Sequence, residues 1–168
     1  MYTIGEAATA TILADSKNKW EFNFFSKPEC SNLCTIPIDG YETFLPPNDR
    51  IGLNGPGKFV SFGKELFDQA GPLSKKLLTQ TYDSFDDVKL FIPHAASKKA
   101  YVDLLSELDI EKEKIFTKVY EDYGNLVSSS VPVGLSLAIE EKLITSGDNV
   151  SLIPTSAGLS GAVVKIIL

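Results

Sequence analysis

Several residue types are scarce in this chain of 168 residues, and each scarcity excludes a class of site. There is one histidine, His94, and there are two cysteines, Cys30 and Cys34. A structural zinc site needs four Cys or His ligands, which these three residues cannot supply. A disulfide between the cysteines is sterically possible, but nothing in the sequence indicates an oxidising compartment. Neither cysteine lies in the strand-turn-helix pattern that presents a catalytic thiol, so we interpret both as ordinary loop or strand residues.

The chain also lacks long hydrophobic runs and segments of one charge sign. No apolar run approaches the roughly 20 residues that cross a bilayer, and the first 14 residues have no basic region that would indicate a secretory signal. The formal net charge is −6 with acidic and basic residues interspersed, which argues against a nucleic-acid partner. No phosphate-binding loop or dinucleotide fingerprint is found. The sequence therefore predicts neither a membrane nor a nucleic-acid partner.

What the chain does contain is an alternation of apolar segments that fits one domain. Hydrophobic residues make up 43% of the sequence, enough for a core in a chain of this length. The pattern predicts an α/β layered sheet. Strands are expected at 3–14, 20–25, 88–92, 115–120, 149–154 and 162–168, and helices at 57–79, 97–108 and 132–146. We expect the first two strands to pair, residues 27–55 to form a long loop, and Gly71-Pro72 to kink or split the first helix.

The most informative stretch is the end of the strand at 88–92. Pro93 stops the strand, His94 follows at once, and Ser97 is a suitable cap for the next helix. The imidazole is therefore predicted at the carboxyl end of a strand, where open α/β sheets bind ligands. A structural histidine in a loop is the alternative that position alone favours.

Two further segments contain turn chemistry. In residues 123–132, Gly124 permits a strained turn and the serines with Pro132 fit a helix N-terminus. Asn125 would matter functionally only if its amide faced His94; otherwise it is a turn residue. Residues 155–161 form a small-residue turn that would let a backbone N–H approach a ligand, although a tight turn alone explains it as well.

Taken together, these segments resemble the C-terminal half of β-ketoacyl-acyl carrier protein synthase III, in the thiolase-fold superfamily. The family's Pro-His-Gln-Ala-Asn segment is similar to Pro-His-Ala-Ala-Ser at 93–97, and its Gly-Asn-Thr-Ser-Ala-Ala-Ser-Val-Pro segment is similar to residues 124–132. Its Gly-Asp-Gly-Ala segment corresponds to Gly-Glu-Ala-Ala at 5–8, and its closing glycine-rich turn to Ser-Ala-Gly at 156–158. The resemblance covers nearly the whole chain, 1–168, and implies a thiolase-like half-domain with a mixed five-stranded sheet and helices on its faces.

The resemblance also implies roles for individual residues. His94 and Asn125 would hydrogen-bond the enolate formed when a malonyl thioester loses carbon dioxide, during Claisen condensation with an acyl thioester in fatty acid or polyketide-type biosynthesis. Backbone N–H groups at Ala157 and Gly158 would contribute to the oxyanion hole. Lys98 or Lys99 would contact the acyl carrier protein. No cofactor is expected, because acyl-CoA and acyl-carrier-protein thioesters are the substrates.

The family's catalytic cysteine belongs to an N-terminal half, and neither cysteine of this chain aligns with it. We therefore expect the fold to be completed by a separate N-terminal-half chain, by a self-associated copy or by a removed segment, and we expect a cytoplasmic homodimer of the completed unit. The chain departs from the family at Ala95, Ser97 and Ser156-Ala157, so two function classes remain open. One is an acyltransferase part that supplies His94 and Asn125. The other is a non-catalytic binding or assembly subunit, and acyl transfer to a different acceptor is a further variant.

Overall fold

The protein is built on one mixed five-stranded sheet, which confirms the expected fold class. The computed structural model describes residues 4–15, 17–40 and 57–168. In the order β1-β7-β5-β4, β4 and β5 are parallel and the other neighbours are antiparallel, and the short β6 pairs with β7. The strands are β1 (Glu21–Ser26), β4 (Val88–Pro93), β5 (Asn149–Ile153), β6 (Thr155–Ser156) and β7 (Ser160–Ile167). A separate two-stranded ladder joins β2 (Cys34–Thr35) to β3 (Val60–Ser61).

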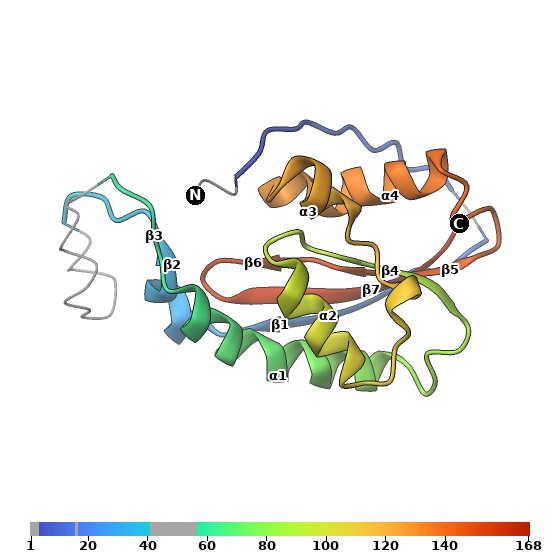
Figure 1. The fold of residues 1–168 in the computed structure, drawn as a ribbon, viewed down its shortest axis with the longest axis horizontal. Coiled ribbons are helices and arrows are strands. Elements are labelled where there is room, and N and C mark those ends of the chain that lie inside the picture. The colour runs from blue at the N-terminus through green and yellow to red at the C-terminus, as the bar shows by residue number, and fades with distance from the viewer. Residues whose placement is uncertain (1–3, 16, 41–56) are drawn as a thin grey trace.

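Helices cover both faces of the sheet (Figure 1). One face carries α1 (Gly63–Thr81) and α2 (Lys98–Ser106), and the other carries α3 (Lys118–Tyr123) and α4 (Ser130–Glu140). Short 3-10 turns are η1 (Pro28–Leu33), η4 (Lys112–Lys114) and η5 (Val127–Ser129). Among the described residues, none of these helices is both long and apolar enough to cross a bilayer.

Strand β4 contributes to two separate cores because successive side chains of a strand point to opposite faces. Phe91 packs in the core under α1 and α2, whereas Leu90 and Ile92 pack in the core under α3 and α4. Phe91 and Ile92 are completely buried. A continuous apolar strand is what burial on both faces requires, which explains why its sequence was recognisable.

The carboxyl end of β4 is fixed on both sides. The N–H of His94 donates to the carbonyl of Ile153 on β5 at 2.9 Å, and the N–H of Phe116 donates to the carbonyl of Phe91 at 2.9 Å. Ile115 also bridges Phe91. The backbone from which the histidine projects is therefore held by β5 and by the 115–116 segment together.

The strand expected at 3–14 is wrong for the residues that the structure describes. Only Ile4 forms a bridge, to Asn125, and β1 pairs with β7 rather than with this segment. Figure 1 shows the segment running outside α3 and α4. Ile12 and Leu13 are 95% and 74% exposed. A β-branched sequence forms a strand only beside a sheet edge, and this path meets none among the described residues.

The first helix begins later than expected and is not split. Val60 and Ser61 form β3, so α1 starts at Gly63, and it continues through Pro72 to Thr81. Because proline has no backbone N–H, the carbonyl of Asp68, four residues earlier, has no helical hydrogen-bond donor. Pro72 is exposed, so solvent can hydrate that carbonyl. The long loop expected at 27–55 contains η1 and β2, and its part from 41 onward lies outside the described residues.

The strand expected at 115–120 is also wrong. Ile115 makes a single bridge, and α3 begins at Lys118. The helix expected at 132–146 ends at Glu140, and the helix after Ser97 ends at Ser106. These errors arise where an element is too short to display a full hydrophobic period.

Candidate active site

The imidazole of His94 lies half-buried directly after β4 and close to the backbone of Val127. Burial lowers the pKa of His94 below its usual 6.5, because a buried imidazolium loses hydration, and the nearby Val127 backbone opposes this in part. The ring is therefore neutral at neutral pH. A neutral imidazole has one N–H donor and one nitrogen that accepts.

The helix that follows His94 begins as the sequence predicts. Ser97 caps α2, its hydroxyl accepting from the N–H of Ala100 at 3.3 Å. One turn further on, the buried hydroxyl of Tyr101 hydrogen-bonds the hydroxyl of Thr155 at 2.7 Å. Burial raises the pKa of Tyr101 to about 12. The start of α2 is thus tied to the strand that leads into the 155–161 turn.

A small cavity adjoins His94. Its volume is about 10 Å³, room for about one water molecule and not for an acyl chain. The lining residues are Pro93, His94, Ala95, Ser97, Lys98, Tyr101, Phe116, Thr117 and Tyr120. The described residues therefore place chemical groups at this point without enclosing a substrate volume.

Asn125 is held by a turn at the end of α3. Gly124 has a φ of 75°, which favours glycine and ends the helix. The side-chain oxygen of Asn125 accepts from the N–H of Val127 at 2.9 Å, and its carbonyl accepts from the N–H of Gly5 at 3.0 Å. With its oxygen engaged, the carboxamide retains its NH₂ group as a donor, and no partner for that group is found among the described residues.

The structure brings His94 and Asn125 together through one residue that the sequence did not single out. Val127 donates its N–H to the Asn125 side chain, and its backbone also lies close to the imidazole of His94. The signal that could have found this contact is the Asn-x-x pattern, because Asn side chains bond their own backbone two residues on. The contact of His94 with residues 33 positions away has no such local signal.

The turn proposed for the oxyanion hole lies at the same end of the sheet. Gly158 has a φ of 93°, and Ala157 is exposed. The turn begins at Thr155, two residues after Ile153, whose carbonyl binds the N–H of His94. Neither Ala157 nor Gly158 lines the cavity beside His94. The structure therefore places this turn near the site without joining it to the imidazole.

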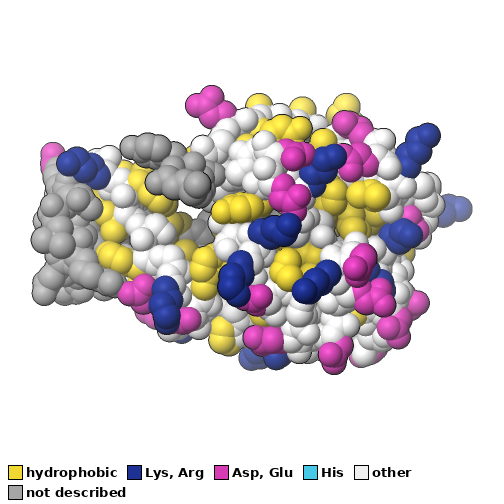
Figure 2. Space-filling view, viewed as in Figure 1, with side chains coloured by type: hydrophobic (Ala, Val, Ile, Leu, Met, Phe, Trp, Pro, Cys, Tyr) yellow, Lys and Arg dark blue, Asp and Glu magenta, His cyan; other side chains and the backbone are white. Residues whose placement is uncertain are grey.

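The two lysines on the first turn of α2 differ in their surroundings. Lys98 lines the His94 cavity and forms an ion pair with Glu121 at 2.5 Å. Lys99 pairs with Asp103 one turn along its own helix, and its side chain is 84% exposed. Figure 2 shows basic side chains interspersed with acidic ones over the viewed side of the molecule, whose lower part is formed by α1 and α2. Lys99 is the more accessible of the two.

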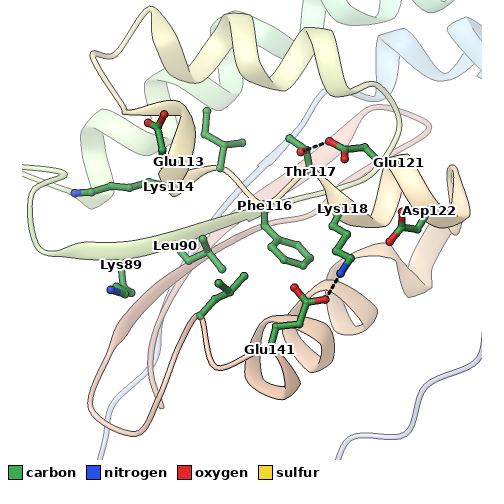
Figure 3. Close-up of a pocket in the computed structure, with 12 residues that line it drawn as sticks. Lys89, Leu90, Glu113, Lys114, Phe116, Thr117, Lys118, Glu121, Asp122 and Glu141 are labelled. Atoms are coloured by element: carbon green, nitrogen blue, oxygen red, sulfur yellow. Dashed lines mark hydrogen bonds and ion pairs between the residues drawn. The ribbon is translucent and has the colours of Figure 1, made fainter.

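A larger groove lies beside this site and was not predicted. It has a volume of about 550 Å³ and runs between the start of β4, η4, α3 and the end of α4. Figure 3 shows Phe116 pointing into it, with Lys118 directed at Glu141 and Thr117 at Glu121. Phe116 and Thr117 line both this groove and the His94 cavity, and so form the wall between them.

The surroundings of the two cysteines agree with their interpretation as ordinary loop or strand residues. Cys30 is buried and Cys34 half-buried, and both are free thiols. Burial raises the pKa of Cys34 above 9.0, which disfavours a thiolate. Neither cysteine lines the His94 cavity. Among the described residues, no group of three or more His, Cys, Asp or Glu side chains could hold a metal ion.

Comparison with known proteins gives a consistent result. Residues 78–166 match the family model described as 3-Oxoacyl-[acyl-carrier-protein (ACP)] synthase III C terminal. The chain is 37% identical over 167 residues to beta-ketoacyl-[acyl-carrier-protein] synthase III of Natranaerobius thermophilus, covering 93% of this chain and 50% of that protein. It is 31% identical over 172 residues to the protein of the same name from Porphyra purpurea, covering 96% and 48%. The chain thus spans about half the length of these relatives.

Solved structures show the same fold. The 3-oxoacyl-[acyl-carrier-protein] synthase III of Aquifex aeolicus superposes with a TM-score of 0.75 at 22% identity, covering 93% of this chain and 46% of that chain. Xanthomonas campestris OleA, solved with bound lauric acid and lauroyl-CoA, superposes with a TM-score of 0.69 at 18% identity, covering 89% and 41%. The thiolase-like fold inferred from sequence is therefore confirmed. On the family-model match and the relatives above 30% identity, this chain belongs to the 3-oxoacyl-[acyl-carrier-protein] synthase III C-terminal family.

Proposed function

We propose that this chain is the C-terminal part of a beta-ketoacyl-acyl carrier protein synthase III-like acyltransferase. The supporting observation is convergence: the ring of His94, just after β4, lies close to the backbone of Val127 in η5, and the side-chain oxygen of Asn125 accepts from the N–H of that same residue. Two polar side chains from segments far apart in sequence are thereby brought to one residue. This arrangement fits a site that stabilises charge on an oxygen atom.

The proposed reaction has two stages. A cysteine thiolate outside this chain attacks an acyl thioester, and the carrier thiol leaves. A malonyl thioester then loses carbon dioxide, and the electron pair of the broken bond forms an enolate. The enolate carbon attacks the acyl-enzyme, the new carbon–carbon bond forms, and the cysteine thiolate is released. No cofactor takes part, because the substrates are acyl-CoA and acyl-carrier-protein thioesters.

His94 and Asn125 are proposed to bind the enolate oxygen. The carboxamide NH₂ of Asn125 is a donor at every pH, and the imidazole donates from whichever ring nitrogen carries a proton. Such donors stabilise developing charge most when they are preorganised and water is excluded. The backbone N–H groups of Ala157 and Gly158 would bind the tetrahedral oxyanion, provided that the turn closes toward the acyl group.

The carrier protein is proposed to dock beside α2. Lys98 and Lys99 are the candidate contacts with its phosphopantetheine or its acidic surface. Lys99 is the more exposed, and its partner Asp103 lies on the same helix. Binding the carrier protein would therefore replace only a surface ion pair that contributes little to stability. Lys99→Glu should weaken carrier binding more than Lys98→Glu, in which a pair with Glu121 is also lost.

The catalytic cysteine is proposed to come from an N-terminal half that packs on the face carrying α4. Large apolar side chains are exposed on or near this face, notably Phe22 and Phe24 on β1 and Ile139 on α4. Exposed apolar patches of this kind mark interaction surfaces. We further propose that the completed unit is a cytoplasmic homodimer, as the family resemblance implies.

The proposal is tested by reconstitution. The chain is combined with an N-terminal half that carries the nucleophilic cysteine, and partner acylation and condensation are followed separately by intact mass and product analysis. His94→Ala should abolish condensation and leave acylation of the partner intact, whereas Lys112→Ala, an exposed change on η4, should alter neither. Undiminished product formation by His94→Ala would overturn the proposal.

A second candidate is a binding or assembly subunit without its own catalytic role. The size of the cavity beside His94, about 10 Å³, supports it, because no acyl group fits there in the chain alone. It predicts that product formation by any complex is insensitive to both His94→Ala and Asn125→Ala. Acyl transfer to an acceptor other than malonyl-acyl carrier protein is a third possibility, supported by the departures from the family's segments at Ala95, Ser97 and Ser156-Ala157, and is distinguished by the mass of the product.

A further inference from the structure

The segment from Ile4 to Ala7 runs along the loop that carries Asn125, and we call this segment the strap. Ile4 forms a parallel bridge with Asn125, and the N–H of Gly5 donates to the carbonyl of Asn125 at 3.0 Å. The hydroxyl of Ser129 donates to the carbonyl of Ala7 at 3.1 Å. The strap therefore holds the loop at Asn125 and again at Ser129.

Gly5 brings the strap closer to the loop than any other residue could. A Cβ at this position would lie 2.1 Å from the carbonyl oxygen of Tyr123 and 3.0 Å from Cδ2 of Leu126. The shorter contact is with backbone, so the rotation of a side chain cannot relieve it. Gly5 is not among the glycines with a positive φ, so its own conformation does not require glycine. The glycine is therefore explained by the close approach of two backbone segments.

Ser129 shows that the loop uses a capping side chain to bind the strap. It occupies the N-cap position of α4, where a serine hydroxyl normally accepts a hydrogen bond from the first turn of the helix. No such bond forms here, and the hydroxyl donates to Ala7 instead. Both polar side chains that flank η5, those of Asn125 and Ser129, are thus engaged by backbone groups.

The peptide group that Gly5 binds is part of the ring that holds the Asn125 side chain. The side-chain oxygen of Asn125 accepts from the N–H of Val127 at 2.9 Å, and this bond closes a ring through the two peptide groups on either side of Leu126. The carbonyl of Asn125 belongs to the first of these peptide groups. Because Gly5 binds that carbonyl, it resists the rotation that would open the ring and release the side chain.

A closed ring leaves the carboxamide of Asn125 with its NH₂ group as the donor. A donor stabilises developing charge best when it is held in place before the charge appears. We propose that Gly5 is a positioning residue, whose N–H clamps the Asn125 loop and keeps the NH₂ group in one orientation for the enolate oxygen. This inference rests on the proposed function, which assigns that donor to Asn125, and it adds the strap to the site.

The strap lies at the surface, so variants that release it should leave the core folded. Ile4 is 57% exposed, and Figure 1 shows the segment running outside α3 and α4. Neither of the two core clusters includes a residue of the strap. Changes in the Asn125 loop can therefore be measured in a folded chain.

The first test observes the ring by NMR of the full chain. The N–H of Val127 is bonded to Asn125, so its hydrogen exchange reports whether the ring is closed. Gly5→Ala forces the strap away from the loop, and exchange at Val127 should become about 2–10-fold faster, the effect of losing one net hydrogen bond. The carboxamide signals of Asn125 should shift as well. Gly71→Ala, the same substitution on α1 where a Cβ would meet no atom within 4 Å, should change neither.

The second test measures condensation and partner acylation in the reconstituted pair. Asn125→Ala removes the donor and should slow condensation about 10²–10³-fold. Gly5→Ala misplaces the donor and should slow condensation by up to about 100-fold, with acylation of the partner unchanged. In the Asn125→Ala background, Gly5→Ala should slow condensation no further, because the group that the strap positions is already absent. A merely structural role for Gly5 would slow condensation equally in both backgrounds.

Ser129→Ala removes the bond to Ala7 without altering the strap, and it decides the matter if Gly5→Ala does not fold. It should also make exchange at Val127 faster. Unchanged exchange at Val127 in folded Gly5→Ala or in Ser129→Ala, or equal slowing of condensation in the two backgrounds, would overturn the inference. If exchange responds as expected but the unmodified pair makes no product, the proposed condensation fails and the clamp on the loop stands. If Asn125→Ala slows condensation and Gly5→Ala does not, the proposed function stands and the positioning role fails.

Discussion

The same substitution, glycine to alanine, should change stability in opposite directions at two helical positions. A Cβ at Gly134 of α4 would lie 2.7 Å from Cγ2 of Ile92, 3.4 Å from Val119 and 3.5 Å from Phe116. Ile92 is completely buried, so its methyl group cannot move away into solvent. A Cβ at Gly63, the first residue of α1, would meet no atom within 4 Å. Close packing therefore opposes the change at Gly134 and permits it at Gly63.

The magnitudes follow from two opposing effects. Overpacking a core costs about 1–3 kcal/mol, and replacing glycine by alanine within a helix gains up to ~1 kcal/mol. Gly134→Ala should therefore lower the free energy of unfolding by up to about 3 kcal/mol, and Gly63→Ala should leave it unchanged or raise it by up to ~1 kcal/mol. Urea denaturation followed by circular dichroism measures both. Because Ile92 lies two residues before His94, the ring signals of His94 should shift in Gly134→Ala alone.

A gain of stability in Gly134→Ala would refute the close approach of α4 to β4. A double variant tests whether the loss of stability arises from the contact between the new Cβ and Ile92. Ile92→Ala removes the methyl group that the new Cβ would meet, so Gly134→Ala should cost less in that background than in the unmodified chain. Equal costs in the two backgrounds would show that the loss does not arise from this contact.

Three further predictions concern single groups. Thr155→Val should lower the free energy of unfolding by about 1–2 kcal/mol, because it leaves the buried hydroxyl of Tyr101 without its partner, and Tyr101→Phe should cost less, because the hydroxyl that it leaves, on the half-buried Thr155, can meet water. In urea denaturation the double variant should lose less than the sum of the two. The pKa of His94 is lower in the folded chain than its unfolded value of 6.5, so the unfolded state takes up the proton first as the pH falls. The free energy of unfolding should therefore decrease as the pH drops from about 6.5 through the folded pKa. Urea denaturation across this pH range should show a smaller decrease for His94→Gln than for the unmodified chain. Parallel curves for the two proteins would contradict the lowered pKa. Phe24→Ser changes a side chain that is 69% exposed, so it should leave the free energy of unfolding within about 0.5 kcal/mol and reduce the binding of a hydrophobic fluorescent dye.

The parts of the fold that the sequence predicted are those with local signals. The strand ending at Pro93 was recognisable because burial on both faces requires a continuous apolar run. The start of α2 was recognisable because Ser97 is a capping residue placed just before a helical period. Both features can be read within about ten residues, so no tertiary information was needed to place His94 at a strand-to-helix turn.

The errors lie where tertiary contacts decide the structure. Ile115 and Phe116 are buried and apolar, as in a strand, but they meet β4 at one bridge before α3 begins. The segment around Ile12 has a strand-like composition and no neighbouring strand among the described residues. Pairing between distant segments cannot be read from the composition of one of them.

The candidate site shows the same division. The motif resemblance named His94 and Asn125, and the structure brings both to the backbone of Val127. The left-handed conformation of Val127 was not predicted, because a β-branched residue is among the least suited to it. The hydrogen bond between Tyr101 and Thr155 joins residues 54 positions apart and has no sequence signal.

The rim of the site indicates where an acyl group would have to be enclosed. The cavity beside His94 holds about one water molecule, so the residues around the imidazole supply donors without an acyl volume at that point. Exposed apolar side chains surround the Asn125 loop: Val127 at 54%, Tyr123 at 50%, and Ile4, which bridges Asn125, at 57%. Burying such side chains against a partner is favourable, and it would also remove water from the hydrogen bonds of His94 and Asn125. Under the proposed function, the association that completes the apolar pocket would therefore also strengthen the hydrogen bonds that His94 and Asn125 donate. Acyl-chain preference would be determined by the partner surface that closes over Val127 rather than by His94 or Asn125 themselves.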